Sequence, residues 1–302
     1  MTEGQPAEEQ PVTAGPALAD AGTDLLAFPG RAPAHGVMAR RARARGVWYY
    51  AETVLRGMRA YFWPILIYSV GQPLVYMVAL GIGLGTLVQQ GAGAVDGVDY
   101  LTFVAPALLV STVVMSVTAE MTYPVMAGFK WQRLYHAPAA SPLEPGQVAM
   151  GHLVAVVIRL VLQSLVFWLV MLAFGAAPSG WAQSLLVVPV GVLTATAFGA
   201  PLQAYAATLR DEGLQFAFIQ RFVVMPMFLF AGTFFPLSVL PGYLQWIGWI
   251  SPVWHGTELA RLASYGAPLS PVMLVVHLGF LLALTVGGVL AAVRVYTRRL
   301  HT

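Results

Sequence analysis

Six long apolar runs constrain this chain more than any other feature of its sequence. They lie at residues 61–88, 100–124, 147–174, 184–209, 215–235 and 271–296. A helix needs about 20 apolar residues to cross the hydrocarbon core of a bilayer, and each run supplies that length. Charged residues make up only 10% of the chain, whereas an average soluble domain has about 25%. The sequence therefore predicts an all-α integral membrane protein with six transmembrane helices.

Residues 236–270 separate the fifth run from the sixth and have a different character. The segment is apolar and aromatic, but prolines divide it into pieces too short to span a bilayer. Such pieces suit interfacial or re-entrant helices, so we expect a helical hairpin before the last span. Its characteristic side chains are Phe234, Phe235, Pro236, Trp249, His255, Glu258 and Arg261. Glu258 and Arg261 are three residues apart and should pair on one helix; a role as a gate is the alternative.

The basic residues indicate the topology. With six spans, nearly all lysines and arginines fall on one side of the membrane, in the segments before the first run, between the second and third, between the fourth and fifth, and at the C-terminal end. Arg261 would lie on the other side. Because positive residues are retained in the cytoplasm, both termini are expected there, in a multi-pass protein of the bacterial plasma membrane.

The segment before the first run has two parts. Residues 1–45 are expected to form a disordered cytoplasmic tail that ends in a basic cluster, and residues 46–302 the membrane domain. From residue 47 onward, polar side chains recur every three or four positions, which is typical of an amphipathic helix lying in the membrane interface. The residues that mark its outer face and headgroup layer are Trp48, Tyr49, Glu52 and Arg56. The alternative is a frayed extension of the first span.

Residues 126–150 form a polar, cationic insert between the second and third runs. Its cations and aromatics alternate as Phe129, Lys130, Trp131, Arg133, Leu134 and Tyr135, and prolines follow at positions 138, 142 and 145. This pattern predicts a short amphipathic helix followed by a proline-stiffened return. On the cytoplasmic side, the helix would offer a docking surface for a soluble partner. The alternative is an ordinary loop whose cations only fix the topology.

Ionisable residues inside the runs are costly, at about 2.5–3.5 kcal/mol near a span centre. The polar candidates for a translocation path are Glu120, His152, Arg159, Gln163 and Arg221. His152, Arg159 and Gln163 are spaced to share one helix face, which should point toward protein or water. At about 1.5 Å per residue, Glu120 and Arg221 lie at similar depths and could pair, whereas Arg159 lies deeper. These residues either line a path or form structural ion pairs.

Several function classes find no support in the residues. The chain has no phosphate-binding Gly-x-x-x-x-Gly-Lys-Ser/Thr loop, no H-E-x-x-H and no Gly-x-Ser-x-Gly, which are signatures of nucleotide binding and hydrolysis. It has no cysteine, and its six histidines follow no metal-ligand spacing. We therefore expect no enzyme activity, no metal and no ATP site in this chain, and no nucleic acid as a partner.

Four segments resemble a known family. They are QPLVYMVALGIGLG at 72–85, YLTFVAPALL at 100–109, HAPAASPL at 136–143, and the stretch 225–261 with its FAGTFFP turn and Pro-x-x-His hairpin. Together they resemble the permease subunits of ABC-2 type exporters, in particular the nodulation-type lipo-oligosaccharide and daunorubicin-resistance permeases.

The resemblance implies a pair of permease copies bound to a pair of separately encoded ATPase subunits, which would bind Mg-ATP. Residues 129–135 would then be the coupling helix seated on the ATPase, and residues 234–264 an outer hairpin. The cargo would be amphiphilic, either a lipid-linked glycan or lipo-oligosaccharide, or a hydrophobic antibiotic. A membrane enzyme acting on lipid-linked substrates and an ion-coupled carrier are the alternatives from other classes, and both would work without an ATPase.

Overall fold

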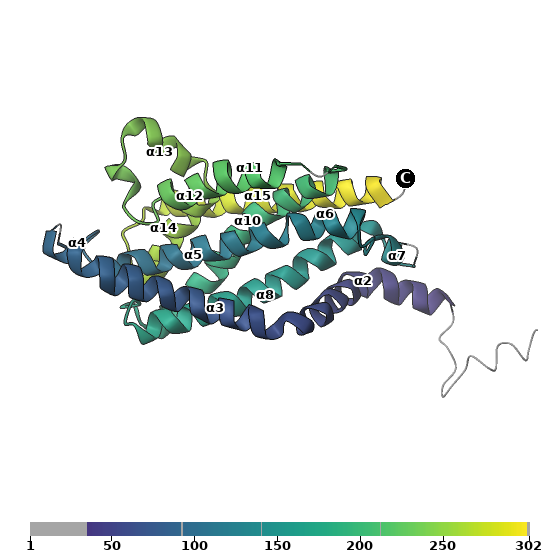
Figure 1. Ribbon diagram of the computed structural model, residues 1–302, viewed down its shortest axis with the longest axis horizontal. Coiled ribbons are helices and arrows are strands. Elements are labelled where there is room, and N and C mark those ends of the chain that lie inside the picture. Colours follow the sequence, from purple (N-terminus) through teal and green to yellow (C-terminus); the bar gives the residue numbers. More distant parts are fainter. Residues whose placement is uncertain (1–34, 92, 140, 212, 301–302) are drawn as a thin grey trace, which may run out of the picture. The chain divides into compact units, whose positions relative to one another are not determined.

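The computed structural model describes residues 35–91, 93–139, 141–211 and 213–300. The predicted tail over residues 1–34 lies outside them. Residues 1–44 and 45–302 form separate units, and the packing described below is that of the second. Apart from one isolated bridge between Val95 and Val98, the secondary structure of the described residues is helical (Figure 1). The predicted all-α class is confirmed.

The longest helices follow the predicted runs. They are α3 (Phe62–Tyr76), which continues through the π-helical η2 (Met77–Leu84) into α4 (Gly85–Gly91), then α5 (Tyr100–Glu120), α8 (Pro145–Ala173), α10 (Val187–Thr208) and α15 (Pro271–Leu300). The shorter elements are η1 (Arg59–Tyr61), α6 (Tyr123–Lys130), α7 (His136–Ala139), α9 (Gly180–Ser184), α11 (Gln215–Ile219), η3 (Gln220–Val224), α12 (Met225–Phe230), η4 (Leu237–Val239), α13 (Gly242–Trp249) and α14 (Pro252–Tyr265).

Five helical runs among the described residues are long and apolar enough to cross a membrane. The expected fifth span is shorter than the others, because the helical run over Gln215–Phe230 ends before the predicted residue 235. The cause is local. Ala231 ends the helix, and Gly232 adopts a positive φ of 79°, a conformation that favours glycine and breaks a helix.

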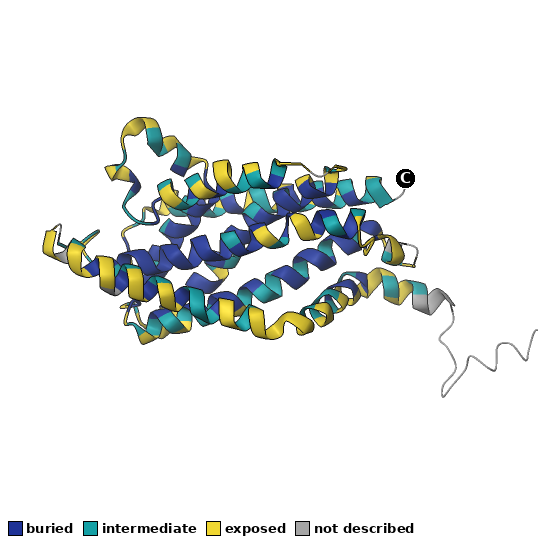
Figure 2. Cartoon of the chain, viewed as in Figure 1, coloured by how far each residue is buried: buried dark blue, intermediate teal, exposed yellow. Residues whose placement is uncertain are grey.

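Helices α5 and α10 form the centre of the bundle, and Figure 2 shows almost all of α5 buried. α10 packs against α5, α8, α14 and α15. Glycines allow these close approaches: a methyl group at Gly199 would overlap Val117 of α5, and one at Gly256 of α14 would overlap Thr194 of α10. Small residues bring membrane helices close enough for dense van der Waals contact.

The helix ends follow from capping residues in the sequence. Asp99 accepts a hydrogen bond from the backbone N–H of Thr102 at the start of α5, at 3.1 Å. Glu144 and Gln147 form a reciprocal capping box at the start of α8. Ser251 caps α14, which begins with Pro252. Such caps satisfy backbone N–H groups that have no partner within the helix.

The N-terminal helix differs from the prediction in its start. Helix α2 (His35–Met58) begins ten residues before the predicted end of the disordered tail, so the basic cluster lies on a helix. Alanine and arginine, which alternate here, are both strong helix formers. Over residues 45–58 the helix has one exposed and one buried face: Trp48 and Tyr49 are exposed, and Ala51 is fully buried. Glu52 and Arg56 form an ion pair one turn apart on the exposed face.

Candidate functional site

The predicted helix over residues 129–135 is wrong. Helix α6 ends at Lys130, and the chain then turns through Arg133, which has a positive φ of 48°. The backbone N–H of Tyr135 donates to the carbonyl of Gly128 at 3.4 Å. Gly128 has no side chain, and the Tyr135 ring occupies the place of its missing Cβ. We therefore call residues 131–134 the α6–α7 turn, and the flanking residues Phe129 and Tyr135 its two ends.

The two ends of the α6–α7 turn are buried, which corrects their prediction as partner contacts. Phe129 is 4% exposed and Tyr135 is 2% exposed. Their ring centroids are 4.7 Å apart, and Tyr296 of α15 lies 4.8 Å from Phe129 and 5.2 Å from Tyr135. Burial raises the pKa of the Tyr135 hydroxyl well above its usual range, and Tyr296 and Tyr50 raise it further. The turn is thus fixed to an aromatic cluster drawn from four parts of the chain.

The turn itself is exposed. Trp131 is 51% exposed and Leu134 is 55% exposed; Arg133 is exposed and Lys130 half-buried. A large aromatic, an aliphatic and a cationic side chain therefore project from a turn whose two ends are packed in the core of the bundle. Tryptophan and arginine, the types of Trp131 and Arg133, are enriched among the residues that dominate binding energy at protein interfaces.

The predicted pairing of Glu120 with Arg221 is wrong, because Glu120 pairs with Arg159. The carboxylate oxygen and the Arg159 Nη2 atom are 2.9 Å apart, and both side chains are largely shielded. The depth estimate failed because helical structure resumes at Tyr123 after a short break and continues to Lys130. Glu120 therefore lies deeper than four residues from the end of the second span. Arg221 is exposed on the π-helical η3.

The other two polar residues of the α8 face bind neighbouring helices. Gln163 donates from Nε2 to the Ser116 hydroxyl of α5 at 2.8 Å. His152 is buried, and its Nδ1 lies 3.4 Å from the Tyr135 hydroxyl. The prediction that this face points toward protein is confirmed. Their predicted role in a path is not tested by these contacts.

The predicted hairpin is a pair of helices, α13 and α14, that follows the turn at Gly232. The predicted pair on α14 is present: Arg261 Nη1 lies 3.2 Å from Glu258. Arg261 is 2% exposed, and its Nη2 also donates to the carbonyl of Gly232 at 2.6 Å. Trp249 is exposed, whereas Phe234, Phe235 and Pro236 are half-buried. Arg261 thus anchors the hairpin in the bundle.

A histidine pair joins the hairpin to α15. His255 Nδ1 lies 2.7 Å from His277 Nδ1, and His255 Nε2 lies 3.0 Å from the carbonyl of Trp249. Since a carbonyl only accepts, Nε2 of a neutral His255 carries the proton and its Nδ1 accepts from His277. Burial lowers the pKa of His255, and the bond to Trp249 opposes that shift.

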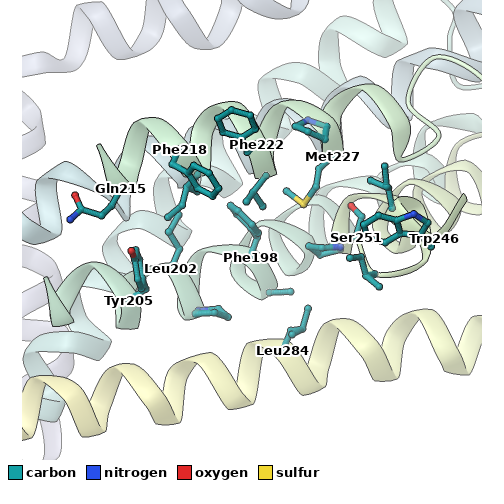
Figure 3. A pocket seen from close by; sticks show the side chains of 18 of the residues that line it. Phe198, Leu202, Tyr205, Gln215, Phe218, Phe222, Met227, Trp246, Ser251 and Leu284 are labelled. Carbon is teal, nitrogen blue, oxygen red and sulfur yellow. The ribbon is translucent and has the colours of Figure 1, made fainter. Parts of the chain in front are cut away.

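A large apolar groove lies between α10, the α11–α12 run, α13 and α15, with a volume of about 1130 Å³. In Figure 3, Phe198, Phe218, Phe222 and Leu284 line its middle, Tyr205 and Gln215 lie at one end, and Trp246 and Ser251 at the other. An apolar channel with polar groups at its ends matches the chemistry of an amphiphile. We call it the α10–α12 groove.

Sequence reasoning missed the aromatic side chains of this groove and the role of Tyr296. Phe218 and Phe222 are four residues apart and share a helix face, which was a usable signal. Tyr296 gave no such signal. It lies in a long apolar run, and no local pattern there indicates that its ring contacts the distant α6–α7 turn. Within the described part of the chain, no three His, Asp or Glu side chains are arranged to hold a metal ion.

The sequence of this chain matches a known family of membrane transporters. The ABC-2 type transporter family matches residues 55–265. Nodulation protein J of Rhizobium meliloti is 30% identical over 77% of this chain and 85% of its own length. Nodulation protein J of Rhizobium leguminosarum bv. viciae is 29% identical over 77% and 86%.

A more distant relative is a transport permease. The inner membrane transport permease YadH of Escherichia coli is 24% identical over 80% of this chain and 90% of its own length. The family match covers more than half of the chain and includes the α6–α7 turn, the α8 face and the hairpin. This chain is a multi-pass membrane protein that belongs to the ABC-2 type transporter family of membrane permeases.

Proposed function

We propose that this chain is the permease subunit of an ATP-driven exporter that moves an amphiphilic molecule out of the cytoplasm. Family membership supports transport, and the α10–α12 groove supports an amphiphilic cargo. In this proposal the chain crosses the plasma membrane six times, with the α11–α12 run as the short fifth span and α13–α14 as a re-entrant hairpin. Both termini then lie in the cytoplasm, as the positive-inside rule requires.

The energy would come from a separately encoded ATPase that binds Mg-ATP. One observation supports this most directly: the α6–α7 turn exposes Trp131, Arg133 and Leu134 while its ends, Phe129 and Tyr135, are fixed in the core. A docking surface can transmit a movement only when it is rigidly joined to the helices that must move. The outer face of α2, with Trp48 and Arg56, lies at the same end of the bundle and would be a second contact.

The proposed cargo is a lipid-linked glycan or lipo-oligosaccharide. The apolar groove would accept acyl chains, and relatives named Nodulation protein J support this choice within the family. A hydrophobic antibiotic is the second candidate, because Phe198, Phe218, Phe222 and Trp246 could stack on a planar ring system. The working unit would contain a second copy of this chain, which native mass spectrometry of the complex would measure.

Co-purification in lipid nanodiscs tests the docking surface. The full chain is expressed with a candidate ABC ATPase subunit, as the wild type and as Trp131→Ala, Leu134→Ala and Arg133→Glu. We expect each change to weaken association by about five- to thirty-fold, because the loss of such a side chain from an interface costs about 1–2 kcal/mol. The matched control is Trp181→Ala, since Trp181 is 70% exposed on α9, beyond the other end of α8.

The outcomes separate the function classes. Loss of association in the three turn variants, with Trp181→Ala unchanged, supports the exporter. If no ATPase binds the wild type, the exporter is excluded. Transport of a fluorescent lipid by the reconstituted chain alone under an ion gradient would then identify a carrier, and conversion of a lipid-linked substrate would identify an enzyme.

A further inference from the structure

A second cavity lies on the other side of the bundle from the α10–α12 groove, between the end of α2, the start of α3, and α8. Its volume is about 190 Å³, less than the roughly 300–1,000 Å³ of a pocket for a whole drug-sized ligand. It therefore suits one headgroup and not a complete amphiphile. Most of its wall is apolar, formed by Leu55, Met58, Phe62, Ile65, Leu66, Ile158, Leu162 and Val166.

The polar lining of this cavity consists of two arginines, together with Ser69 and Gln163. Arg59 comes from η1 and Arg159 from α8. Arg159 binds Glu120 through Nη2 at 2.9 Å, but its Nε is buried and has no hydrogen-bond partner among the described residues. None of the lining residues is acidic. With Glu120 neutralising one of the two arginines, the site carries a net charge of about +1, which favours a monoanion.

The cavity lies where lipid headgroups are expected. Helix α8 has 29 residues, or about 43 Å at 1.5 Å per residue, and exceeds the hydrocarbon thickness of about 30 Å. Its first part packs on α2, since Gly151 lies against the backbone of Val47. Arg59 lies at the junction where the amphipathic α2 ends and the apolar α3 begins. Arg159 is the central residue of α8, so the cavity extends inward from the interface at Arg59 toward the middle of α8.

We infer that this cavity binds the phosphate group of an anionic membrane lipid. Arg59 and the unpartnered Nε of Arg159 would hold the phosphate, and an acyl chain would follow the apolar wall between α3 and α8. Basic pockets between membrane helices at the interface bind anionic headgroups. The arginine side chain supplies donors in a fixed geometry that matches phosphate oxygens. This site is separate from the α10–α12 groove, and its occupancy does not depend on ATP or on export.

Native mass spectrometry of the full chain tests the inference. The protein is exposed to mixed vesicles of phosphatidylglycerol and phosphatidylcholine, extracted, and the retained lipids counted. We expect the wild type to retain phosphatidylglycerol in preference, and Arg59→Gln to lower that retention about five-fold, as expected for the loss of one interfacial cation. The matched control is Arg294→Gln, since Arg294 is exposed on α15 and does not line the cavity.

A second variant separates the loss of lipid binding from the loss of folding. Arg159→Gln alone would leave Glu120 without its partner, so the double change Glu120→Gln with Arg159→Gln removes the pair together. The double variant should retain its thermal transition and lose the lipid preference. Soluble glycerol phosphate, added as a competitor, separates a lipid site from a site for a free phosphate.

Three results would overturn the inference. The first is equal loss in Arg59→Gln and Arg294→Gln, which would indicate general attraction of a basic surface. The second is full retention in the folded double variant. The third is displacement of the lipid by glycerol phosphate as effectively as by phosphatidylglycerol, which would make it a small-anion site. Because lipid retention is measured without the ATPase, these results leave the exporter proposal unaffected.

Discussion

Arg261 of α14 lies over the ring of Phe103 of α5, with its guanidinium carbon 3.7 Å from the ring centroid. The same guanidinium donates to the carbonyl of Gly232 at 2.6 Å and to Glu258 at 3.2 Å. One buried cation therefore connects the hairpin, the central helix and the turn after α12. Its charge is satisfied within the protein and is not presented to a passing substrate.

Replacing this cation should destabilise the whole bundle. Arg261→Met removes the contacts to Phe103 and Gly232 and leaves the shielded Glu258 without its partner. The expected cost is about 3–5 kcal/mol, typical of breaking a buried pair from one side. The double change Glu258→Gln with Arg261→Met should cost less, because no unpaired charge remains. Thermal unfolding in detergent, followed by tryptophan fluorescence, measures both, and equal transitions in the wild type and Arg261→Met would contradict the anchor role.

A methyl group at Gly128 should displace the α6–α7 turn. Gly128→Ala places a Cβ where the Tyr135 ring lies, so we expect destabilisation of about 1–3 kcal/mol, as for other overpacked sites. Coupling to the ATPase should fall as well, although no exposed residue has changed. The control is Gly279→Ala on α15, because nothing lies within 4 Å of its added Cβ. In the control, coupling to the ATPase should be unchanged. Its stability should be unchanged or slightly higher, since alanine is a better helix former than glycine.

The Glu120–Arg159 pair predicts strong coupling in a double-mutant cycle. Glu120→Gln and Arg159→Gln should each destabilise the protein, and the double variant should cost less than their sum by about 0.5–3 kcal/mol. Arg221→Gln should stay within about 0.5 kcal/mol of the wild type, because Arg221 is exposed and surface changes are usually small. A coupling energy between Glu120 and Arg221 in the same assay would contradict the Glu120–Arg159 pair and support the pairing predicted from depth alone.

Acid should weaken the hairpin through His255. Its pKa is lowered in the folded protein, so below about pH 6.5, the ordinary value, the unfolded state binds the proton more readily. The stability contributed by neutral His255 is present above that pH and is lost as the pH falls through the folded pKa. The thermal midpoint should therefore fall more steeply between pH 7.5 and pH 5 in the wild type than in His255→Gln. His136→Gln, at an exposed histidine, should keep the wild-type slope.

The sequence predicted the central helices well because their signals are local. The run predicted at 147–174 is α8, Pro145–Ala173, and the run predicted at 271–296 is contained in α15, Pro271–Leu300. Apolar length identifies such helices, and a proline in the first turn marks where they begin. The pairing of Glu258 with Arg261 was also predictable, since both residues lie on one helix at a fixed spacing.

Relationships between distant segments were not predictable in the same way. Counting residues along a helix gives the depth of Glu120 in the membrane. It does not give the rotation of α5 about its axis, which decides that the Glu120 side chain faces α8. Phe129 and Tyr135 fit an exposed amphipathic pattern as well as a buried aromatic one. Their burial depends on Tyr296, more than 150 residues away in the sequence, and on the absence of a side chain at Gly128. No local pattern contains that information.

The order of the inward-facing arginines along the chain has a consequence for synthesis. Arg159 follows its partner Glu120, Arg261 follows the acceptors of Phe103, Gly232 and Glu258, and Arg299 follows the carbonyls of Ala207 and Leu209. Because the N-terminal part of a chain leaves the ribosome first, each of these cations is synthesised after the groups that will satisfy it. None of the three must wait for a binding partner in a segment that has not yet been made.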